Sequence, residues 1–548
     1  MVNHSLSLSG QSGRTEIDRG ILFWFRGKLG AGFGLGDRGR SLDEGQRMKY
    51  SHNRNMKRNK KECLNGAITK RRVPQPPLCN LPVDVLSHIL SQLPINDAIR
   101  TSVLARKWKN IWRHHTNLTF DSATMRKHYF RTPSGYGFVN DKEYIERVDT
   151  VLHQHSGVGV ERMEVNYSLH KKHADHIDRW VSFAVAAKAK ELIIDLSGGY
   201  KVLSFRNLSN DRYRIRDEPC DLPSQLFSTF SYLKRLELTS VSLQLSADFI
   251  GFLNLKHLTL VDVSMTDEDA QRMLSGCQLL EFLKIAYCRM VTSIKMPHPM
   301  DQLKHLVVDN CPLLQEIELN CSPTTLEYTG TEVPFVLAST SKLKSMLIKF
   351  MMPYHAALWY IVTRFPSTLR SLESLTLHVI ELQRPILPGS PLKFTYLRCL
   401  RLELVLGGIS NEERKNDALD YAYLLEVAPF IEKLELLMFM TCRHQPYHKK
   451  DGKLRNRTPH QHAHLKFVRI SGFFGHKDQV ELALHILRSS VVLEKMDITP
   501  KIEIGYSPDF ARQCFERTGY VDGYNIATEF VCKEHHRNVV EAIRASFP

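Results

Sequence analysis

A short hydrophobic pattern recurs through most of the chain and predicts a series of stacked strands. In each copy, aliphatic residues occupy the first, fourth and sixth positions, as in Leu233 to Leu238 and Leu255 to Leu260. Because side chains alternate between the two faces of an extended strand, the aliphatic positions point to one side and the intervening polar positions to the other. The pattern therefore predicts repeated coils with one buried face and one polar face.

The spacing of the copies indicates the type of repeat. Copies starting at residues 233, 255, 280, 303 and 326 are 22 to 25 residues apart, a period typical of leucine-rich repeats. A second pair, Ile294 and Ile317, also lies 23 residues apart between these copies, which predicts an extended segment on the outer side of each coil. The remaining copies start at residues 160, 343, 372, 397, 431, 465 and 493, and the later ones lie 25 to 34 residues apart. Those coils are expected to carry helices or loops.

Residues 78–121 follow a helical pattern instead. Pro82 can open and Pro94 can close a first helix, Asn96 or Asp97 can cap a second, and a third carries the tryptophans. The apolar residues exceed what so small a bundle can cover. Either a partner protein or the rest of the chain is expected to cover them. The residues at helical spacing are Val85, Leu86, Ile89, Leu90 and Leu93, then Val103, Leu104, Trp108, Ile111 and Trp112.

The stretch from Leu81 to Pro94, followed by Arg100 to Trp108 and then Trp112, resembles an F-box. The family usually has Ser at the position of Ala105, which removes one polar group and leaves the apolar face intact. The resemblance implies docking on the Skp-type linker subunit of a cullin-RING ubiquitin ligase. The implied contact residues are Leu81, Pro82, Val85, Leu86, Ile89, Leu90, Leu93, Pro94, Val103, Leu104, Trp108 and Trp112.

The last repeats resemble a second family. Residues 461–500 are similar to the FBD module that follows the repeats in many plant F-box proteins, which implies a strand, a glycine-containing turn, an amphipathic helix and a second strand that shield the solenoid end. We therefore expect an α/β fold in which a three-helix F-box precedes a curved leucine-rich-repeat solenoid with parallel strands on its concave face. Residues 122–158 connect the two parts, residues 159–460 form the solenoid, and residues 501–548 are a C-terminal extension that matches no pattern.

The polar positions of the repeats predict a binding surface. Stacked strands place these side chains in a ladder on the concave face, which repeat proteins use to bind macromolecules. Each one taken alone is also explained as a solvated polar group. The predicted target-binding residues are Lys234, Glu237, His257, Thr259, Lys284, His305, Arg401 and Glu403.

Charge is concentrated at the N-terminus. Residues 1–77 hold 16 Lys and Arg against 6 Asp and Glu, so +10 of the net charge of +16 lies there. Their composition and the closing Pro74 to Pro77 predict a disordered arm and a stiff linker. Basic clusters at 57–61 and 70–72 fit either a nuclear import signal or a solvated tail, so we expect a location in the nucleus, the cytoplasm or both.

Catalytic and metal-binding patterns are missing from the sequence. Eleven cysteines without a C-x-x-C pair fit reduced thiols rather than disulfides or zinc. His460, His462 and His464 form a loose cluster, and Cys532, His535 and His536 form another. Neither cluster offers four ligands at a known spacing, so surface histidines and no metal are expected.

Two further patterns are expected to be structural or accidental. Gly34 to Gly39 matches G-x-G-x-x-G without a flanking strand and helix, so no cofactor is expected. Asp267 and Asp269 are better explained as helix-capping residues than as a catalytic pair. No apolar run approaches the roughly 20 residues of a membrane span, so no membrane anchor is expected.

The sequence thus predicts a substrate-recognition adaptor of an SCF-type ubiquitin ligase rather than an enzyme. Its expected partners are the Skp-type linker, through it cullin and RING subunits, and an unidentified target protein. Two alternatives remain. One is a leucine-rich scaffold that acts outside a ligase. The other, less favoured, is a nucleic-acid-binding protein that uses the basic arm.

Overall fold

The computed structural model divides the chain into two compact units that meet between His115 and Thr116. The arm 1–77, with its import signal and glycine pattern, lies outside the described residues. The structure describes residues 81–104, 106–125, 131–132, 135–136, 140–198, 218–222, 230–296, 298–321, 323–331, 333–337, 340–351, 357–381, 383–385, 387, 389, 392–407, 414–440, 442–456, 461–504, 517–534 and 538–546.

The first unit contains two α-helices and two short 3-10 turns. As predicted, Pro82 precedes helix α2 (Val83–Ser91). Pro94 takes the N-cap position of α3 (Ile95–Thr101), so Asn96 and Asp97 lie inside this helix and the prediction that either caps it was wrong. The predicted third helix is replaced by η2 (Arg106–Trp108) and η3 (Ile111–His114), because Asn110 between them has φ −117° and ψ −1°, away from α-helical values.

A small apolar core holds the first unit together. The inward positions of α2 and both tryptophans of the 3-10 turns are buried to within a few per cent, as the helical spacing indicated. A hydrogen bond of 3.0 Å between the His115 ring and the Leu93 carbonyl ties the end of the module back to its first helix. The buried apolar residues are Leu86, Leu90, Leu93, Ile95, Ala98, Trp108, Ile111 and Trp112.

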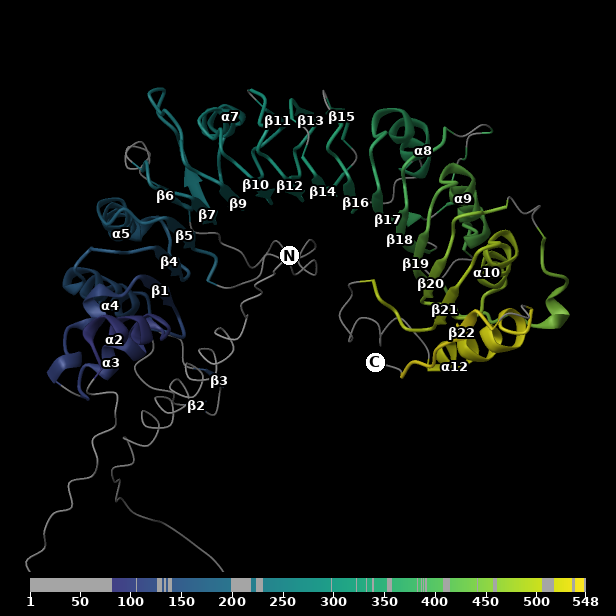
Figure 1. The fold of residues 1–548 in the computed structure, drawn as a ribbon, viewed down its shortest axis with the longest axis horizontal. Helices are drawn as coiled ribbons and strands as arrows, with labels where there is room; N and C mark the ends of the chain where they lie inside the picture. The colour runs from purple at the N-terminus through teal and green to yellow at the C-terminus, as the bar shows by residue number, and fades with distance from the viewer. Residues whose placement is uncertain are drawn as a thin grey trace, which may run out of the picture. The chain divides into compact units, whose positions relative to one another are not determined.

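The second unit is built on one long parallel sheet, as the repeated pattern predicted. Figure 1 shows its strands side by side along the inner side of an arc, with helices such as α7 and α8 on the outer side. Fifteen strands are found among the described residues, in the order in which they pair. They are β1 (Asn117–Asp121), β4 (Arg162–Asn166), β5 (Glu191–Asp195), β7 (Arg235–Thr239), β9 (His257–Val261), β10 (Phe282–Ala286), β12 (His305–Asp309), β14 (Thr325–Gly330), β16 (Ser345–Phe350), β17 (Ser374–Glu381), β18 (Cys399–Leu406), β19 (Lys433–Met440), β20 (Phe467–Ser471), β21 (Lys495–Thr499) and β22 (Val540–Ala542).

The outer side of the coils carries short strands and helices. The predicted pairing of Ile294 with Ile317 is confirmed, because β11 (Ser293–Lys295) and β13 (Glu316–Leu319) are parallel neighbours in that register. Later coils contain helices, as their longer spacing indicated. The remaining elements are β2 (Arg131–Thr132), β3 (Gly135–Tyr136), α4 (Asp141–Gln154), η4 (Lys171–His173), α5 (Ala174–Ala186), β6 (Cys220–Leu222), β8 (Val241–Leu243), α7 (Asp267–Ser275), β15 (Phe335–Leu337), α8 (Ala357–Thr368), η7 (Ala418–Ala422), α9 (Tyr423–Val427), η8 (Lys449–Asp451), α10 (Lys477–Ser489), α12 (Arg517–Ile526), η9 (Ala527–Val531).

One predicted repeat is shifted by three residues. Leu326 pairs with Leu306, which is the fourth and not the first position of the preceding copy. The first position of this coil is therefore Pro323, which is buried in place of the usual leucine. The pattern missed this coil's start because proline replaces the aliphatic residue there. The coil is correspondingly shorter than the predicted period.

Both ends of the sheet extend beyond the predicted solenoid. Residues 117–121, expected to close the helical module, form β1 and pair with β4. At the other end, β22 from the C-terminal extension pairs with β21. Residues 461–500 form a strand, a turn and a helix followed by a strand, but β22 lies beyond them. The extension, and not this segment alone, therefore covers the last coil.

Among the residues described, no helix combines the length and apolar character needed to cross a membrane.

Candidate functional site

The inner face of the sheet carries the predicted ladder of polar side chains. In each strand, alternate residues are buried behind the sheet and the others face the inner side, as the pattern iBiBi of β7 and β12 shows. Because the strands pair in register, equivalent residues of successive coils line up in rows. We call the inner-facing side chains of strands β4 to β21 the inner ladder.

Three predicted target-binding residues share one row of the inner ladder. Glu237 on β7 pairs with Thr259 on β9, which pairs with Lys284 on β10. All three are partly exposed. Glu237 accepts a 2.5 Å hydrogen bond from Arg235 two residues earlier on the same strand. This row therefore offers both charges and a hydroxyl to a partner.

Lys234 lies just outside the ladder, before β7 begins. Its equivalents in neighbouring coils alternate in charge and form ion pairs from coil to coil, including Lys190 with Glu161 at 2.7 Å and Glu281 with Lys304 at 2.6 Å. The hydrogen bonds from Lys256 and Lys304 lower the pKa of Glu281 to about 2. This edge row therefore joins neighbouring coils, and Lys234 is an exposed member of it.

An aromatic cluster occupies the next row and was only half anticipated. The ring of Phe282 lies between two predicted residues, stacked on His257 with centroids 6.0 Å apart and edge-on to His305 at 5.2 Å. His305 is also hydrogen bonded to Glu327 at 2.8 Å. The sequence pattern did not single out Phe282, because it occupies a variable position of the repeat. Only the register of β9, β10 and β12 brings the three rings together.

The other two predicted residues, Arg401 and Glu403, belong to an ion-pair network on β18. Arg401 donates to Glu435 at 2.9 Å and to Glu403 at 3.2 Å. Glu403 is nearly buried and also contacts His378 at 3.2 Å and Lys349 at 3.4 Å. Burial alone would raise the pKa of Glu403, but the hydrogen bond from His378 and the surrounding positive charges lower it to about 2. A carboxylate so fully satisfied is a structural group rather than a free contact.

The ladder is partly covered near its C-terminal end. Strands β17, β18 and β19 are eight residues long, and Val405 and Phe439 lie in one apolar row beside Ile380. Ile502 and Ile504, from the segment after β21, pack against this row. The open part of the ladder therefore runs mainly over the earlier strands, where the aromatic cluster lies.

The structure divides the twelve predicted linker-contact residues by exposure. Side chains that the module buries maintain its shape, and exposed ones are available to a partner. Buried are Leu86, Leu90, Leu93, Trp108 and Trp112, partly exposed are Leu81 and Ile89, and exposed are Pro82, Val85, Pro94, Val103 and Leu104.

An exposed apolar surface remains on the first unit. Val103 is 84% exposed and Leu104 is 48% exposed in the turn after α3, while Val85 is 39% exposed on α2. Val83, which the pattern did not select, is 60% exposed. Exposed apolar groups gathered on so small a module indicate a surface that binds a partner.

The predicted helix-capping role of the Asp267 and Asp269 pair is confirmed. Thr266 accepts from the backbone N–H of Asp269, whose carboxylate accepts in return from the Thr266 backbone at 3.2 Å. Asp267 accepts from the backbone N–H of Thr292 at 2.8 Å. Both carboxylates are thus used to fix α7 and the neighbouring coil.

The histidine cluster differs from its prediction in one respect. His462 is 1% exposed, so the prediction of a surface histidine was wrong for this residue, which forms an isolated bridge with Ser490 behind β20. His460, His535 and His536 lie outside the described residues. Within the described part of the chain, no group of three or more potential ligands could hold a metal ion. The cysteines of this part are all free thiols.

The fold and the sheet register define the class as leucine-rich-repeat proteins with an N-terminal F-box. The family model of the At1g61320/AtMIF1 LRR domain matches residues 151–525, and the F-box model matches residues 78–120. The chain belongs to this leucine-rich-repeat family, and its class is one of adaptor proteins rather than enzymes.

Relatives in Arabidopsis thaliana share both parts. The F-box/FBD/LRR-repeat protein At1g13570 is 30% identical over 44% of this chain and 53% of its own length. F-box/LRR-repeat protein 13 is 21% identical over 77% of this chain and 89% of its own length. F-box/FBD/LRR-repeat protein At5g56420 is 28% identical over 50% of this chain and 54% of its own length. The chain thus spans about half the length of At1g13570 and At5g56420.

Proposed function

We propose that this chain is the substrate-recognition subunit of an SCF-type ubiquitin ligase. The F-box would bind a Skp-type linker, and through it cullin and RING subunits, while the inner ladder would bind the target protein. The observation that carries the proposal is the exposed apolar surface of Val83, Val85, Val103 and Leu104 on an F-box joined to a leucine-rich-repeat solenoid. Ubiquitin transfer itself would be performed by other subunits.

The linker contact can be tested without unfolding the module. Val103→Asp and Leu104→Asp place a charge on an exposed apolar surface, so the variants should fold but lose stoichiometric co-purification with a Skp-type linker and cullin. Burying an unpaired charge at an interface costs several kcal/mol, so a loss of at least about 100-fold in affinity is expected. Trp108→Ala should also abolish binding, because it removes a core residue of the module.

A matched control is available in the second unit. Val158 is 69% exposed in the loop between α4 and β4, so Val158→Asp introduces the same charge away from the F-box and should leave linker binding unchanged. A folded wild-type chain that fails to bind any Skp-type linker would contradict the proposal. That outcome would favour the alternative of a leucine-rich scaffold outside a ligase.

Target binding is proposed for the open part of the inner ladder. The rings of His257, Phe282 and His305 form a continuous aromatic patch flanked by the charged row of Glu237 and Lys284. Aromatic residues of this kind contribute much of the binding energy at protein interfaces. We expect Phe282→Ala to reduce recovery of target proteins from proteasome-inhibited cells while linker binding persists. Leu313→Ala, at a residue 55% exposed in the turn before β13, serves as the control, and equal recovery by both variants would argue against this patch.

We also propose that residues 461–500 form an FBD module. The relative At1g13570 carries FBD in its name, and this segment supplies β20, α10 and β21. An experimental structure of that relative in which the corresponding helix does not lie between two adjacent parallel strands would argue against the assignment.

A location in the nucleus, the cytoplasm or both is likewise proposed, on the basic clusters at 57–61 and 70–72. A fluorescent fusion of the full chain should accumulate in the nucleus and lose that preference when these clusters are changed to alanine. A fusion confined to a membrane compartment would contradict the proposal.

The nucleic-acid alternative makes a different prediction. Binding through the basic arm would weaken steeply as salt increases and would disappear when residues 1–77 are removed. Absence of RNA or DNA binding at low salt would exclude it.

A further inference from the structure

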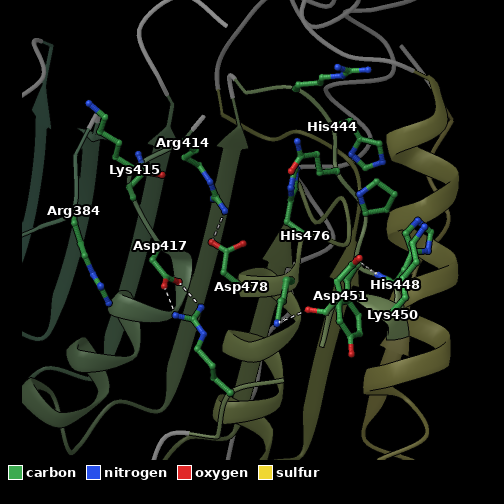
Figure 2. Close-up of a pocket in the computed structure, with 17 residues that line it drawn as sticks. Arg384, Arg414, Lys415, Asp417, His444, His448, Lys450, Asp451, His476 and Asp478 are labelled. Atoms are coloured by element: carbon green, nitrogen blue, oxygen red, sulfur yellow. Dashed lines mark hydrogen bonds and ion pairs between the residues drawn. The ribbon is translucent and has the colours of Figure 1, made fainter. Parts of the chain in front are cut away.

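A basic pocket of about 920 Å³ lies at the edge of the sheet where strands β17 to β20 end. Its residues come from four separate segments, each of which follows the carboxyl end of one of these strands: Arg384 after β17, residues 414–417 after β18, residues 443–455 after β19 and residues 476–478 before and at the start of α10. Figure 2 shows their side chains arranged around one hollow. Loops that follow neighbouring parallel strands commonly build ligand sites at this edge of an α/β sheet.

The lining of this pocket, which we call the edge pocket, is strongly basic. Seven Lys and Arg side chains face three Asp side chains. Burial and the charge of Arg414 lower the pKa of His476 to about 4, so this histidine is neutral near pH 7 and adds no charge. The basic residues are Arg384, Arg414, Lys415, Arg443, Lys450, Arg455 and Lys477, and the acidic ones are Asp417, Asp451 and Asp478.

Acidic groups behind the lining hold two of the arginines in fixed positions. Arg414 donates to Asp478 at 2.6 Å, and Asp478 also accepts from the backbone N–H of Ala418 at 2.6 Å. Arg384 donates to Asp420 through two nitrogens at 2.6 and 2.7 Å. These pairs fix the guanidinium groups before any ligand arrives, which lowers the entropy lost on binding.

A third arginine ties the loop after β19 to helix α10. Arg455 donates to the fully buried Glu481 at 2.7 Å and to Asp417 at 3.1 Å, which joins three of the four segments. Lys477, the first residue of α10, donates to the carbonyl of Asp451 at 3.0 Å. The wall of the edge pocket is therefore a connected hydrogen-bonded structure rather than a set of independent loops.

Three basic side chains of the rim are not neutralised. Lys415, Arg443 and Lys450 are exposed and form no ion pair with any carboxylate in the described part of the chain. Like charges concentrated around one hollow repel one another and raise the local potential, so an anion that enters it is stabilised. The rim thus supplies the excess positive charge, and the fixed arginines shape the wall.

We propose that the edge pocket binds a small, multiply charged anion that carries phosphate groups. Its volume is within the range of small-molecule sites, while its charged lining is unsuited to an apolar ligand. Guanidinium and ammonium groups are the side chains that match phosphate oxygens in charge and geometry. The site is separate from the inner ladder and the F-box, and it does not depend on the adaptor function proposed above.

Calorimetric titration of the full-length chain with sodium tripolyphosphate tests this site. Saturable binding is expected, and it should weaken as salt rises because exposed charges are screened. The triple variant Lys415→Ala/Arg443→Ala/Lys450→Ala should bind at least about tenfold more weakly, because it removes three charge-assisted contacts without breaking an ion pair of the described residues.

A control variant carries the same change in charge elsewhere. Lys393→Ala/Arg370→Ala/Lys533→Ala removes two lysines and one arginine that are exposed outside the edge pocket, and its affinity should stay within about twofold of the wild type. Absence of saturable binding by the wild type, or an equal loss in both triple variants, would overturn the proposal.

Two further comparisons separate the ligand source and the two proposals. Tighter binding of a peptide with two adjacent phosphoserines than of tripolyphosphate would overturn the assignment to a free small molecule. Linker co-purification should be the same for both triple variants and the wild type. Loss of tripolyphosphate binding with linker binding intact would therefore support the edge pocket and leave the adaptor function untouched.

Discussion

Glu381 ends strand β17 with its side chain fully buried and without a compensating charge. Neither carboxylate oxygen has a hydrogen-bond partner among the described residues, and the nearby Tyr421 hydroxyl is likewise unpartnered there. Burial raises the pKa of Glu381 to about 8 from its ordinary value of 4.5. The folded protein therefore keeps Glu381 protonated near neutral pH, because a buried unpaired charge is costly.

Replacing this glutamate should make the protein more stable at high pH. The folded state retains a proton that the unfolded state loses, so the wild type loses stability as pH rises from about 4.5 to about 8. Glu381→Gln removes that loss. Its free energy of unfolding should equal that of the wild type near pH 4.5 and exceed it by roughly 2–4 kcal/mol at pH 8. Denaturant titrations at several pH values measure the difference.

Glu268→Gln is the matched control for this prediction. Glu268 is 80% exposed on α7, so its substitution should not change the pH dependence. A Glu381→Gln variant whose stability follows that of the wild type at every pH would show that Glu381 is charged in the folded protein.

At the scale of elements, the turn between β20 and α10 depends on glycine. Gly472 has φ +66°, and a Cβ atom there would lie 1.9 Å from the carbonyl oxygen of Met438 on the neighbouring strand β19. Gln479 on α10 reads the same turn, since it donates to the Gly472 carbonyl at 2.9 Å and accepts from the Phe474 N–H at 2.9 Å. The turn thus fixes the helix against the strand that precedes it.

We expect Gly472→Ala to destabilise the protein by about 2–4 kcal/mol, because the methyl group clashes with rigid backbone in addition to the strain of positive φ. Gly157→Ala separates these two causes. Gly157 has φ +72° but nothing lies within 4 Å of its Cβ position, so this variant should lose only about 1 kcal/mol. Thermal or chemical denaturation compares the two, and equal losses would contradict the steric explanation.

For the second unit as a whole, stability comes from contacts between neighbouring coils. Each strand pairs with the coil before and the coil after it, and the last pairing is made by β22 against β21. Helix α12 adds to this end, because Tyr520 packs on Phe474 with ring centroids 5.6 Å apart and Gly523 lies close to the Phe473 carbonyl. A terminal coil of this kind protects an otherwise open sheet edge and core.

A chain that ends at residue 504 should therefore aggregate and unfold at a lower temperature. The truncation removes β22 and α12, which leaves the edge of β21 and the apolar face of the last coil exposed. Size-exclusion chromatography with light scattering and thermal denaturation detect the two effects. A monodisperse truncated chain with an unchanged melting temperature would show that the last coil needs no cover.

Most of the strands were predictable because each coil repeats the same local rule. Leu236 and Leu258 are buried and paired as their positions in the pattern predicted. The rule failed where an unusual residue took a core position, as Pro323 did in the coil of β14. It also missed β5, because Ala189 occupies the first position of that coil and is buried there.

The sequence by itself determined the F-box, the solenoid and the polar face of each strand, because these depend on residues close together in the chain. Only the tertiary structure decided which polar groups are free. Stacking brings Phe282 between two histidines, surrounds Glu403 with positive charges, and covers part of the ladder with Ile502 and Ile504. The edge pocket is likewise built from loops 30 to 60 residues apart, at positions that follow no repeat. Such contacts depend on register and loop path, which a local pattern does not specify.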